Sequence, residues 1–103
     1  MNEATQPLST VGDGALVREM EIVNRKGLHA RATAKFVQCV EQFSADVTVS
    51  RAGETVGGTS IMGILTLGAG IGSTIIVTAK GEEAAEVLDA IAALVANRFG
   101  EDE

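Results

Sequence analysis

Aromatic residues and positive charge are both scarce in this sequence. It has no Trp, no Tyr and three Phe, and its eight Lys and Arg stand against fourteen Asp and Glu, a formal net charge of −6. Proteins bind single-stranded nucleic acids through aromatic stacking, and both nucleic acids and anionic membranes attract basic surfaces. The composition therefore argues against nucleic acid or a membrane surface as the main partner.

Cysteine and long apolar runs are also nearly absent. Cys39 is the single cysteine, which excludes an internal disulfide and a cysteine-based zinc site, and we interpret it as a small buried hydrophobe. No stretch approaches the ~18–20 apolar residues of a membrane helix, and residues 1–15 lack the features of a signal peptide. We therefore expect a cytoplasmic protein without membrane insertion, bound metal or other cofactor.

The remaining composition is that of one globular domain. The chain has 103 residues, of which 46% are apolar and 21% charged, and most domains contain ~100–150 residues. Residues 1–15 contain the only proline and show no periodicity, so we predict a flexible tail there. We predict a folded domain over residues 16–100 and a solvated acidic end over residues 101–103.

Hydrophobic periodicity predicts strands and helices along this domain. Alternating apolar residues indicate strands, and apolar residues three or four positions apart indicate helices. The predicted elements are a strand over 16–23, a helix over 30–43, strands over 46–50 and 54–57, a short helix over 60–67, a strand over 74–79 and a helix over 82–99. This β-α-β-β-α-β-α order predicts a two-layer α+β domain, with helices covering one side of an antiparallel sheet.

The most distinctive cluster surrounds His29, the only histidine. It follows the basic, glycine-containing segment 25–27 and stands at the predicted start of a helix. The first turn of a helix has unpaired backbone N–H groups and a positive dipole, and such an end binds phosphate readily. Arg31 adds a guanidinium that can bind phosphate through two parallel hydrogen bonds. A lone histidine is often structural, but a nucleophilic imidazole beside an anion-binding helix end is what a phosphoryl acceptor requires.

Two motifs resemble one known family. Residues 27–31, Gly-Leu-His-Ala-Arg, with the apolar helix pattern that follows, resemble the phosphohistidine signature of HPr, the phosphocarrier of the bacterial phosphoenolpyruvate-dependent phosphotransferase system. Residues 59–68, Thr-Ser-Ile-Met-Gly-Ile-Leu-Thr-Leu-Gly, resemble the HPr segment around a regulatory serine. The resemblance extends over residues 16–99, including the spacing of the two motifs and the order of the elements.

The resemblance implies both the fold and the chemistry. It implies an open-faced β-sandwich, in which a four-stranded antiparallel sheet carries three helices on one face. His29 would accept a phosphoryl group on Nδ1 from the phosphohistidine of enzyme I and pass it to a histidine of an enzyme IIA. Arg31 and the backbone N–H of Ala30 would hold the phosphate. Such a protein is a stoichiometric carrier rather than an enzyme, and the family expectation is a monomer.

Two positions depart from the family pattern. Ala32 stands where the family usually has proline, and Lys26 stands where it often has Asn or Ser. Alanine keeps a backbone donor in the first helical turn, so we expect the helix start to survive. Lys26 offers no acceptor for an imidazole N–H, so the group that orients the ring of His29 stays open. These departures favour a regulatory or nitrogen-branch member over a sugar-transport member.

The second motif contributes a serine and an apolar surface. We predict that Ser60 caps the short helix, and the resemblance implies that a bifunctional HPr kinase/phosphorylase phosphorylates it. If this helix buries its other apolar face, Ile61, Met62 and Leu65 form an exposed patch that would dock a partner. Burial of Met62 and Ile61 in the core is the alternative.

Two other function classes stand beside the phosphocarrier hypothesis. The element order also fits a small-ligand-binding or allosteric regulatory domain of ferredoxin-like topology, which leaves the cluster around His29 unexplained. A pure allosteric adaptor would use Ser60 alone, and HPr-like proteins of that type lack the histidine. The presence of His29 therefore favours the phosphoryl carrier.

Overall fold

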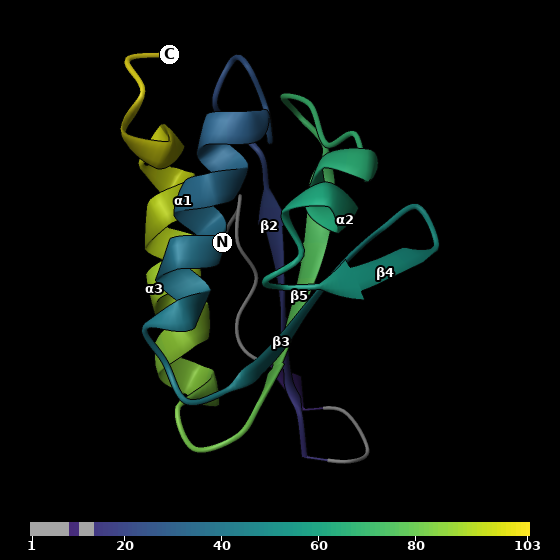
Figure 1. Ribbon diagram of the computed structural model, residues 1–103, viewed down its shortest axis with the longest axis vertical. Helices are drawn as coiled ribbons and strands as arrows, with labels where there is room; N and C mark the ends of the chain where they lie inside the picture. Colours follow the sequence, from purple (N-terminus) through teal and green to yellow (C-terminus); the bar gives the residue numbers. More distant parts are fainter. Residues whose placement is uncertain (1–8, 11–13) are drawn as a thin grey trace.

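An antiparallel sheet forms one layer of the molecule, and helices cover one of its faces (Figure 1). The computed structural model describes residues 9–10 and 14–103. Along the sheet, the main strands are β2 (Leu16–Glu21), β5 (Thr74–Lys80), β3 (Asp46–Arg51) and β4 (Glu54–Gly57). The helices are α1 (Ala30–Glu41), α2 (Ile61–Thr66) and α3 (Ala84–Ala96), followed by the 3₁₀ turn η1 (Arg98–Gly100). The predicted α+β fold, with a four-stranded antiparallel sheet and three helices, is confirmed.

A two-residue strand extends one edge of this sheet. β1 (Ser9–Thr10) pairs antiparallel with β2, so that Thr10 lies opposite Leu16. The flexible tail that we predicted over residues 1–15 falls mostly outside the described residues. The described part of that segment shows strand pairing at β1 and a buried Ala15 next to β2.

The core lies between the sheet and the helices and follows the apolar patterns of the sequence. β5 shows the strand period most clearly, because Ile75, Val77 and Ala79 are buried while Ile76 is exposed on the uncovered face. The largest fully buried side chains include Phe36 of α1, Ile64 of α2 and Leu88 and Ile91 of α3, with Met20 of β2 and Ile22 just after it. The sheet and all three helices therefore share one core.

The last helix ends earlier than we predicted. The apolar pattern predicted a helix through Phe99, but α3 stops at Ala96, and Arg98 and Phe99 adopt left-handed φ values of 57° and 55°. A left-handed residue other than glycine costs roughly 1–2 kcal/mol. Full burial of Phe99 offsets this cost, and Lys35 Nζ donates to Phe99 O at 2.6 Å. The segment after this turn, residues 101–103, lies at the same end of the molecule as the start of α1 (Figure 1).

Candidate functional site

The loop between β2 and α1 is fixed by a glycine that no other residue can replace without strain. Gly27 has a φ of +67°, and a Cβ there would lie 2.6 Å from Ala69 O. The next residue, Leu28, is buried, and its N–H donates to the same Ala69 O at 2.9 Å. The loop that follows α2 thus supports the loop that carries His29.

His29 is the residue directly before α1 and caps it. Its backbone is extended, with φ −76° and ψ −178°, and its Nδ1 accepts a hydrogen bond from the Arg31 backbone N–H at 3.3 Å. The helix start predicted from the sequence is therefore where the structure has it, and one ring nitrogen faces the N-terminus of α1. The side chain is 28% exposed, so a partner can reach it.

The other ring nitrogen contacts a residue that the sequence analysis did not place in the site. His29 Nε2 lies within hydrogen-bond distance of Glu101 Oε2. A carboxylate only accepts, so the neutral ring carries its proton on Nε2. Nδ1, which accepts from Arg31, then holds the lone pair. The hydrogen-bond pattern thus assigns the tautomer whose Nδ1 can act as a nucleophile.

Glu101 corrects our expectation of a solvated acidic end over residues 101–103. Its side chain is 20% exposed, and besides His29 it accepts a hydrogen bond from Asn24 Nδ2 at 3.0 Å. The hydrogen bonds from His29 and then from Asn24 stabilise the carboxylate, which lowers the pKa of Glu101 below its ordinary value. The sequence analysis missed this residue because it stands 72 positions from His29 and no local pattern marks it.

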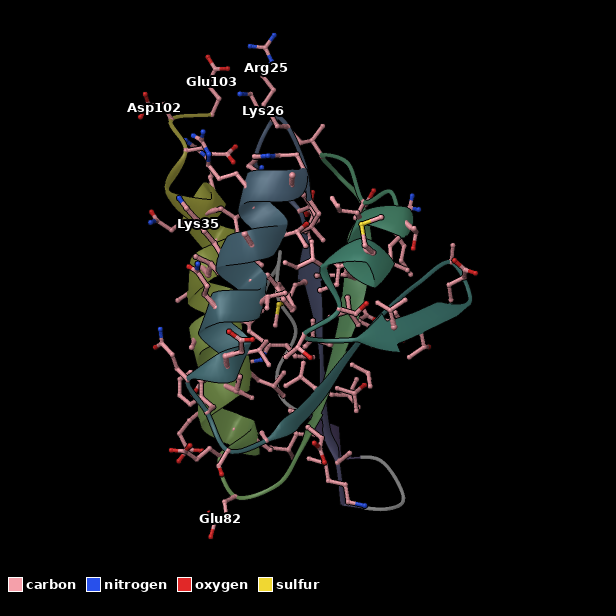
Figure 2. All side chains as sticks on the ribbon, in the orientation of Figure 1. Arg25, Lys26, Lys35, Glu82, Asp102 and Glu103 are labelled. Atoms are coloured by element: carbon pink, nitrogen blue, oxygen red, sulfur yellow. The ribbon has the colours of Figure 1, made fainter. Side chains whose placement is uncertain are left out.

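The two residues after Glu101 complete a short strap across the loop. Arg25 donates to Glu103 twice, from its backbone N–H at 2.5 Å and from its guanidinium at 2.8 Å. The guanidinium of Arg98 donates to Asp102 O at 3.0 Å. Figure 2 shows Asp102 and Glu103 beside Arg25 and Lys26 at one end of the molecule. We call residues 101–103 the C-terminal strap.

Arg31 and Ala30, the predicted phosphate-binding residues, both lie at the exposed start of α1. Within the described part of the chain, the Arg31 guanidinium forms no hydrogen bond or ion pair, and the Ala30 N–H has no acceptor. The structure brings the Arg31 backbone to Nδ1 of His29 and leaves its guanidinium unpaired. Both groups have donors to offer to an anion bound at this helix end.

α2 carries the second predicted group of residues. Ser60 caps this helix, as predicted, because its Oγ accepts from Gly63 N–H at 3.1 Å. Ile61 is 42% exposed and Met62 71% exposed, whereas Leu65 is partly buried. The apolar patch is thus centred on Ile61 and Met62. The sequence analysis did not include Ile71, an apolar residue of the following loop that is 61% exposed.

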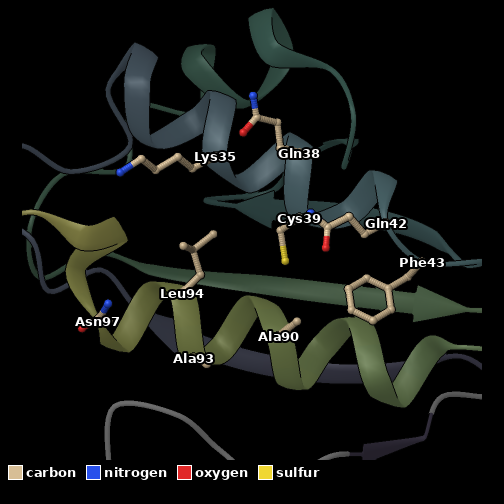
Figure 3. A pocket seen from close by; sticks show the side chains of 9 residues that line it. All are labelled: Lys35, Gln38, Cys39, Gln42, Phe43, Ala90, Ala93, Leu94 and Asn97. Atoms are coloured by element: carbon tan, nitrogen blue, oxygen red, sulfur yellow. The ribbon is translucent and has the colours of Figure 1, made fainter.

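A hollow on the described surface lies away from His29. It is a groove of about 480 Å³ between α1 and α3, with Cys39, Phe43 and Leu94 among its lining residues (Figure 3). Cys39 is half-buried rather than fully buried, and burial raises the pKa of its thiol. The thiol is therefore held in its protonated, less reactive form.

Residues 9–10 and 14–103 hold neither a metal-binding cluster nor a membrane-spanning helix. That part of the chain places no three His, Cys, Asp or Glu residues where they could hold a metal ion. It also contains no helix with the length and apolar character needed to cross a membrane.

The fold and the His29 site together define a class of small α+β phosphocarrier domains. The family described as "PTS HPr component phosphorylation site" matches residues 16–97. The phosphocarrier protein HPr of Cupriavidus necator is 49% identical over 88 residues, covering 85% of this chain and 99% of that protein. The chain belongs to the HPr family of phosphocarrier proteins, and the ferredoxin-like alternative is not favoured.

Other relatives agree in sequence and in structure. The phosphocarrier protein NPr of Shewanella violacea is 40% identical over 86 residues, covering 84% of this chain and 94% of that protein. A crystal structure of HPr-C-His from Thermoanaerobacter tengcongensis has a TM-score of 0.81 at 37% identity, covering 84% of this chain and 98% of that one. Relatives of both names match, so the nitrogen or regulatory branch stays a prediction.

Proposed function

We propose that this protein carries a phosphoryl group on Nδ1 of His29 in the cytoplasm, between the phosphohistidine of enzyme I and a histidine of an enzyme IIA. This proposal rests on the different hydrogen-bond partners of the two ring nitrogens of His29. Nδ1 faces the N-terminus of α1, and Nε2 is held by Glu101. A neutral imidazole in this tautomer has its nucleophilic lone pair where an anion is stabilised.

The transfer step uses this arrangement without any cofactor. The lone pair of Nδ1 forms a bond to phosphorus while the phosphorus–nitrogen bond of the donor histidine breaks, and the donor nitrogen keeps the electron pair. The ring of His29 gains positive charge, and the Glu101 carboxylate beside Nε2–H stabilises that charge. Transfer to the acceptor histidine reverses these changes, so the protein ends unaltered and acts as a stoichiometric carrier.

Arg31 and Ala30 supply the donors for the phosphoryl oxygens in this proposal. The guanidinium of Arg31 is free of other partners in the described part of the chain and can form two charge-assisted hydrogen bonds. The Ala30 N–H and the positive end of the α1 dipole add to this stabilisation.

Docking and regulation complete the proposal at α2. Ile61, Met62 and Leu65 would contact enzyme I or an enzyme IIA, because an exposed apolar patch is typical of a partner surface. Ser60 is exposed, so a kinase such as HPr kinase/phosphorylase can reach its hydroxyl. Phosphorylation there would place nearly two negative charges next to the docking patch.

Phosphorylation in vitro tests the proposed function. The protein is incubated with phosphoenolpyruvate, Mg²⁺ and enzyme I, and the bound phosphate is tested for stability in acid and in alkali. We expect one acid-labile, alkali-stable phosphate per chain in the wild type and in the Ser60→Ala control. His29→Ala should fold normally, because its side chain is not part of the core, and should bind no phosphate. Phosphate on His29→Ala would overturn the assignment.

A further inference from the structure

Asn24 is a fully buried polar residue in the loop between β2 and α1, three residues after β2 ends. Among the described residues, the buried polar or charged side chains are those of Asn24 and Thr33, both 0% exposed. Asn24 Nδ2 donates to Gly27 O at 2.9 Å and to Glu101 Oε1 at 3.0 Å. One amide group therefore ties the loop that carries His29 to the C-terminal strap.

The carboxylate of Glu101 stands between Asn24 and His29. Its Oε1 accepts from Asn24 and its Oε2 contacts His29 Nε2, so both oxygens are engaged. A carboxylate with one anchored oxygen cannot rotate freely, and the anchor fixes where the second oxygen meets the imidazole. Lys26, which directly precedes Gly27, has no hydrogen-bond acceptor in its side chain that could replace Glu101.

The neighbours of the Asn24 amide allow only one orientation of the group. Asn24 Oδ1 is buried without a hydrogen-bond partner in the described structure. Turning the amide over would set an oxygen against Gly27 O and Glu101 Oε1, two acceptors, so the NH₂ group must face them. A buried acceptor without a hydrogen-bond partner is unfavourable. Asn24 Oδ1 stays unpaired because the NH₂ group of the same amide donates to Glu101.

We propose that Asn24 is a positioning residue, which acts through Glu101 to fix the tautomer and orientation of the His29 ring. This inference rests on the proposed function, since the ring it orients is the proposed phosphoryl acceptor. The side-chain hydrogen bonds of Asn24 in the described structure go to Gly27 O and Glu101 Oε1, so its effect on the ring passes through the carboxylate. The same amide also donates to Gly27 O. The test must therefore separate positioning of the His29 ring from support of the loop.

A double-mutant cycle separates the two roles. Asn24→Ala is compared with wild type, and the same substitution is compared again in a Glu101→Ala background, using the rate of phosphoryl acceptance from enzyme I. In the wild-type background we expect about a tenfold to hundredfold loss, the size produced by one hydrogen bond to a charged group. In the Glu101→Ala background we expect little further loss, because the intermediary is already gone. Asn97→Ala is the control, since Asn97 is exposed at the end of α3.

A spectroscopic readout makes the test independent of enzyme I. The ¹⁵N shifts of the His29 ring, at a pH where the ring is neutral, report which nitrogen carries the proton. We expect protonated Nε2 in wild type and in Asn97→Ala, and a shift towards a mixture of tautomers in Asn24→Ala. Thermal unfolding of each variant checks that the fold is retained.

Each outcome has a separate meaning. Equal losses in the two backgrounds, or an unchanged ring spectrum in Asn24→Ala, would overturn the positioning role while leaving the phosphocarrier function intact. Absence of phosphate on wild-type His29 would overturn the proposed function, and the ring spectra would still decide whether Asn24 fixes the tautomer. A loss confined to the wild-type background, together with the shifted spectrum, supports the proposal.

Discussion

Arg31 is the residue whose side chain the structure leaves available for the phosphate. Its backbone N–H is engaged with His29 Nδ1, and its guanidinium is exposed at the first turn of α1. A well-formed contact between a guanidinium and phosphate is worth roughly 1.5–3 kcal/mol, and about 1.4 kcal/mol corresponds to a factor of ten in rate. We therefore expect Arg31→Ala to slow phosphoryl transfer about tenfold to a hundredfold in a stopped-flow assay with enzyme I.

Arg31→Lys is the matched variant for this prediction. It keeps the positive charge but lacks the planar fork of donors, so we expect a smaller loss than with Ala. Arg51→Lys serves as a control away from the site, because Arg51 donates to Leu67 O at the end of α2. Transfer by Arg31→Ala at the wild-type rate would remove Arg31 from the phosphate site.

At the residue scale, only half of the site could be predicted from the sequence. The cap at His29 and the neighbouring Arg31 lie within three consecutive residues, so helix-start chemistry alone brings them together. Glu101 reaches His29 because of the left-handed turn at Arg98 and Phe99. Residues other than glycine rarely adopt positive φ, so no sequence pattern predicts such a turn.

At the scale of single elements, the residue that caps α2 is also the proposed regulatory serine. Ser60 Oγ accepts from Gly63 N–H, so the hydroxyl that a kinase would modify also stabilises the helix start. Ser60→Ala should lower the free energy of unfolding by about 1 kcal/mol, because it removes the cap. Ser60→Asp keeps an acceptor there, so it should unfold close to the wild type in urea.

The same pair of variants tests the regulatory effect. Ser60→Asp adds one negative charge beside Ile61 and Met62, and burying this charge against enzyme I carries a desolvation cost. We expect slower enzyme I-dependent phosphorylation of His29 in Ser60→Asp, whereas Ser60→Ala should transfer at the wild-type rate. Wild-type transfer by Ser60→Asp, or slow transfer explained by unfolding, would count against a role of Ser60 as a switch.

Gly63 sets how closely α2 approaches β4. A Cβ at Gly63 would lie 2.8 Å from Ser60 Oγ and 3.0 Å from Val56 Cβ, so alanine there must push the helix away or break the cap. Overpacking costs roughly 1–3 kcal/mol, and the better helix propensity of alanine returns up to about 1 kcal/mol. We expect Gly63→Ala to lower stability to urea by about 1 kcal/mol.

Gly57→Ala is the matched control for this prediction. A Cβ at Gly57 has no atom within 4 Å, so the change in stability should stay within about 0.5 kcal/mol. If the two variants were equally stable, close packing of α2 against β4 would not explain the glycine.

The elements themselves were largely predictable, and the errors have physical causes. The strand alternation placed Val47 and Val49 on the buried face correctly. Helix α1 begins at Ala30 as predicted, although it ends at Glu41 rather than at residue 43. The prediction also began α3 at Glu82, whereas Glu83 stays outside it and accepts from Ser44 N–H at 2.7 Å.

At the scale of the whole molecule, the C-terminal strap joins the end of the chain to the loop between β2 and α1. Phe99 anchors the turn in the core, Lys35 of α1 holds its carbonyl, and Glu101 then meets His29 and Asn24. The family match ends at residue 97, before this turn. Glu101, which contacts Nε2 of His29, thus lies outside the residues that the family model matches.

The contacts of Glu101 with His29 and Asn24 make the free energy of unfolding depend on pH. The folded state lowers the pKa of Glu101, because the hydrogen bonds from His29 and Asn24 favour its charged form. A lowered pKa means that the contribution to stability is fully present above the ordinary value of about 4.3. It is lost as the pH falls through the lowered, folded-state value.

We therefore predict that Glu101→Gln is less stable than the wild type above about pH 5, and that the gap closes as the pH falls below ~4. Urea unfolding of both proteins at pH values between 7 and 3 measures the gap. The matched control is Glu103→Gln, the same change in the same strap, whose carboxylate forms an exposed pair with Arg25. Because exposed pairs contribute little, this control should follow the wild type throughout. A gap that stayed constant down to pH 3 would show that charge on Glu101 does not hold the strap against the His29 loop.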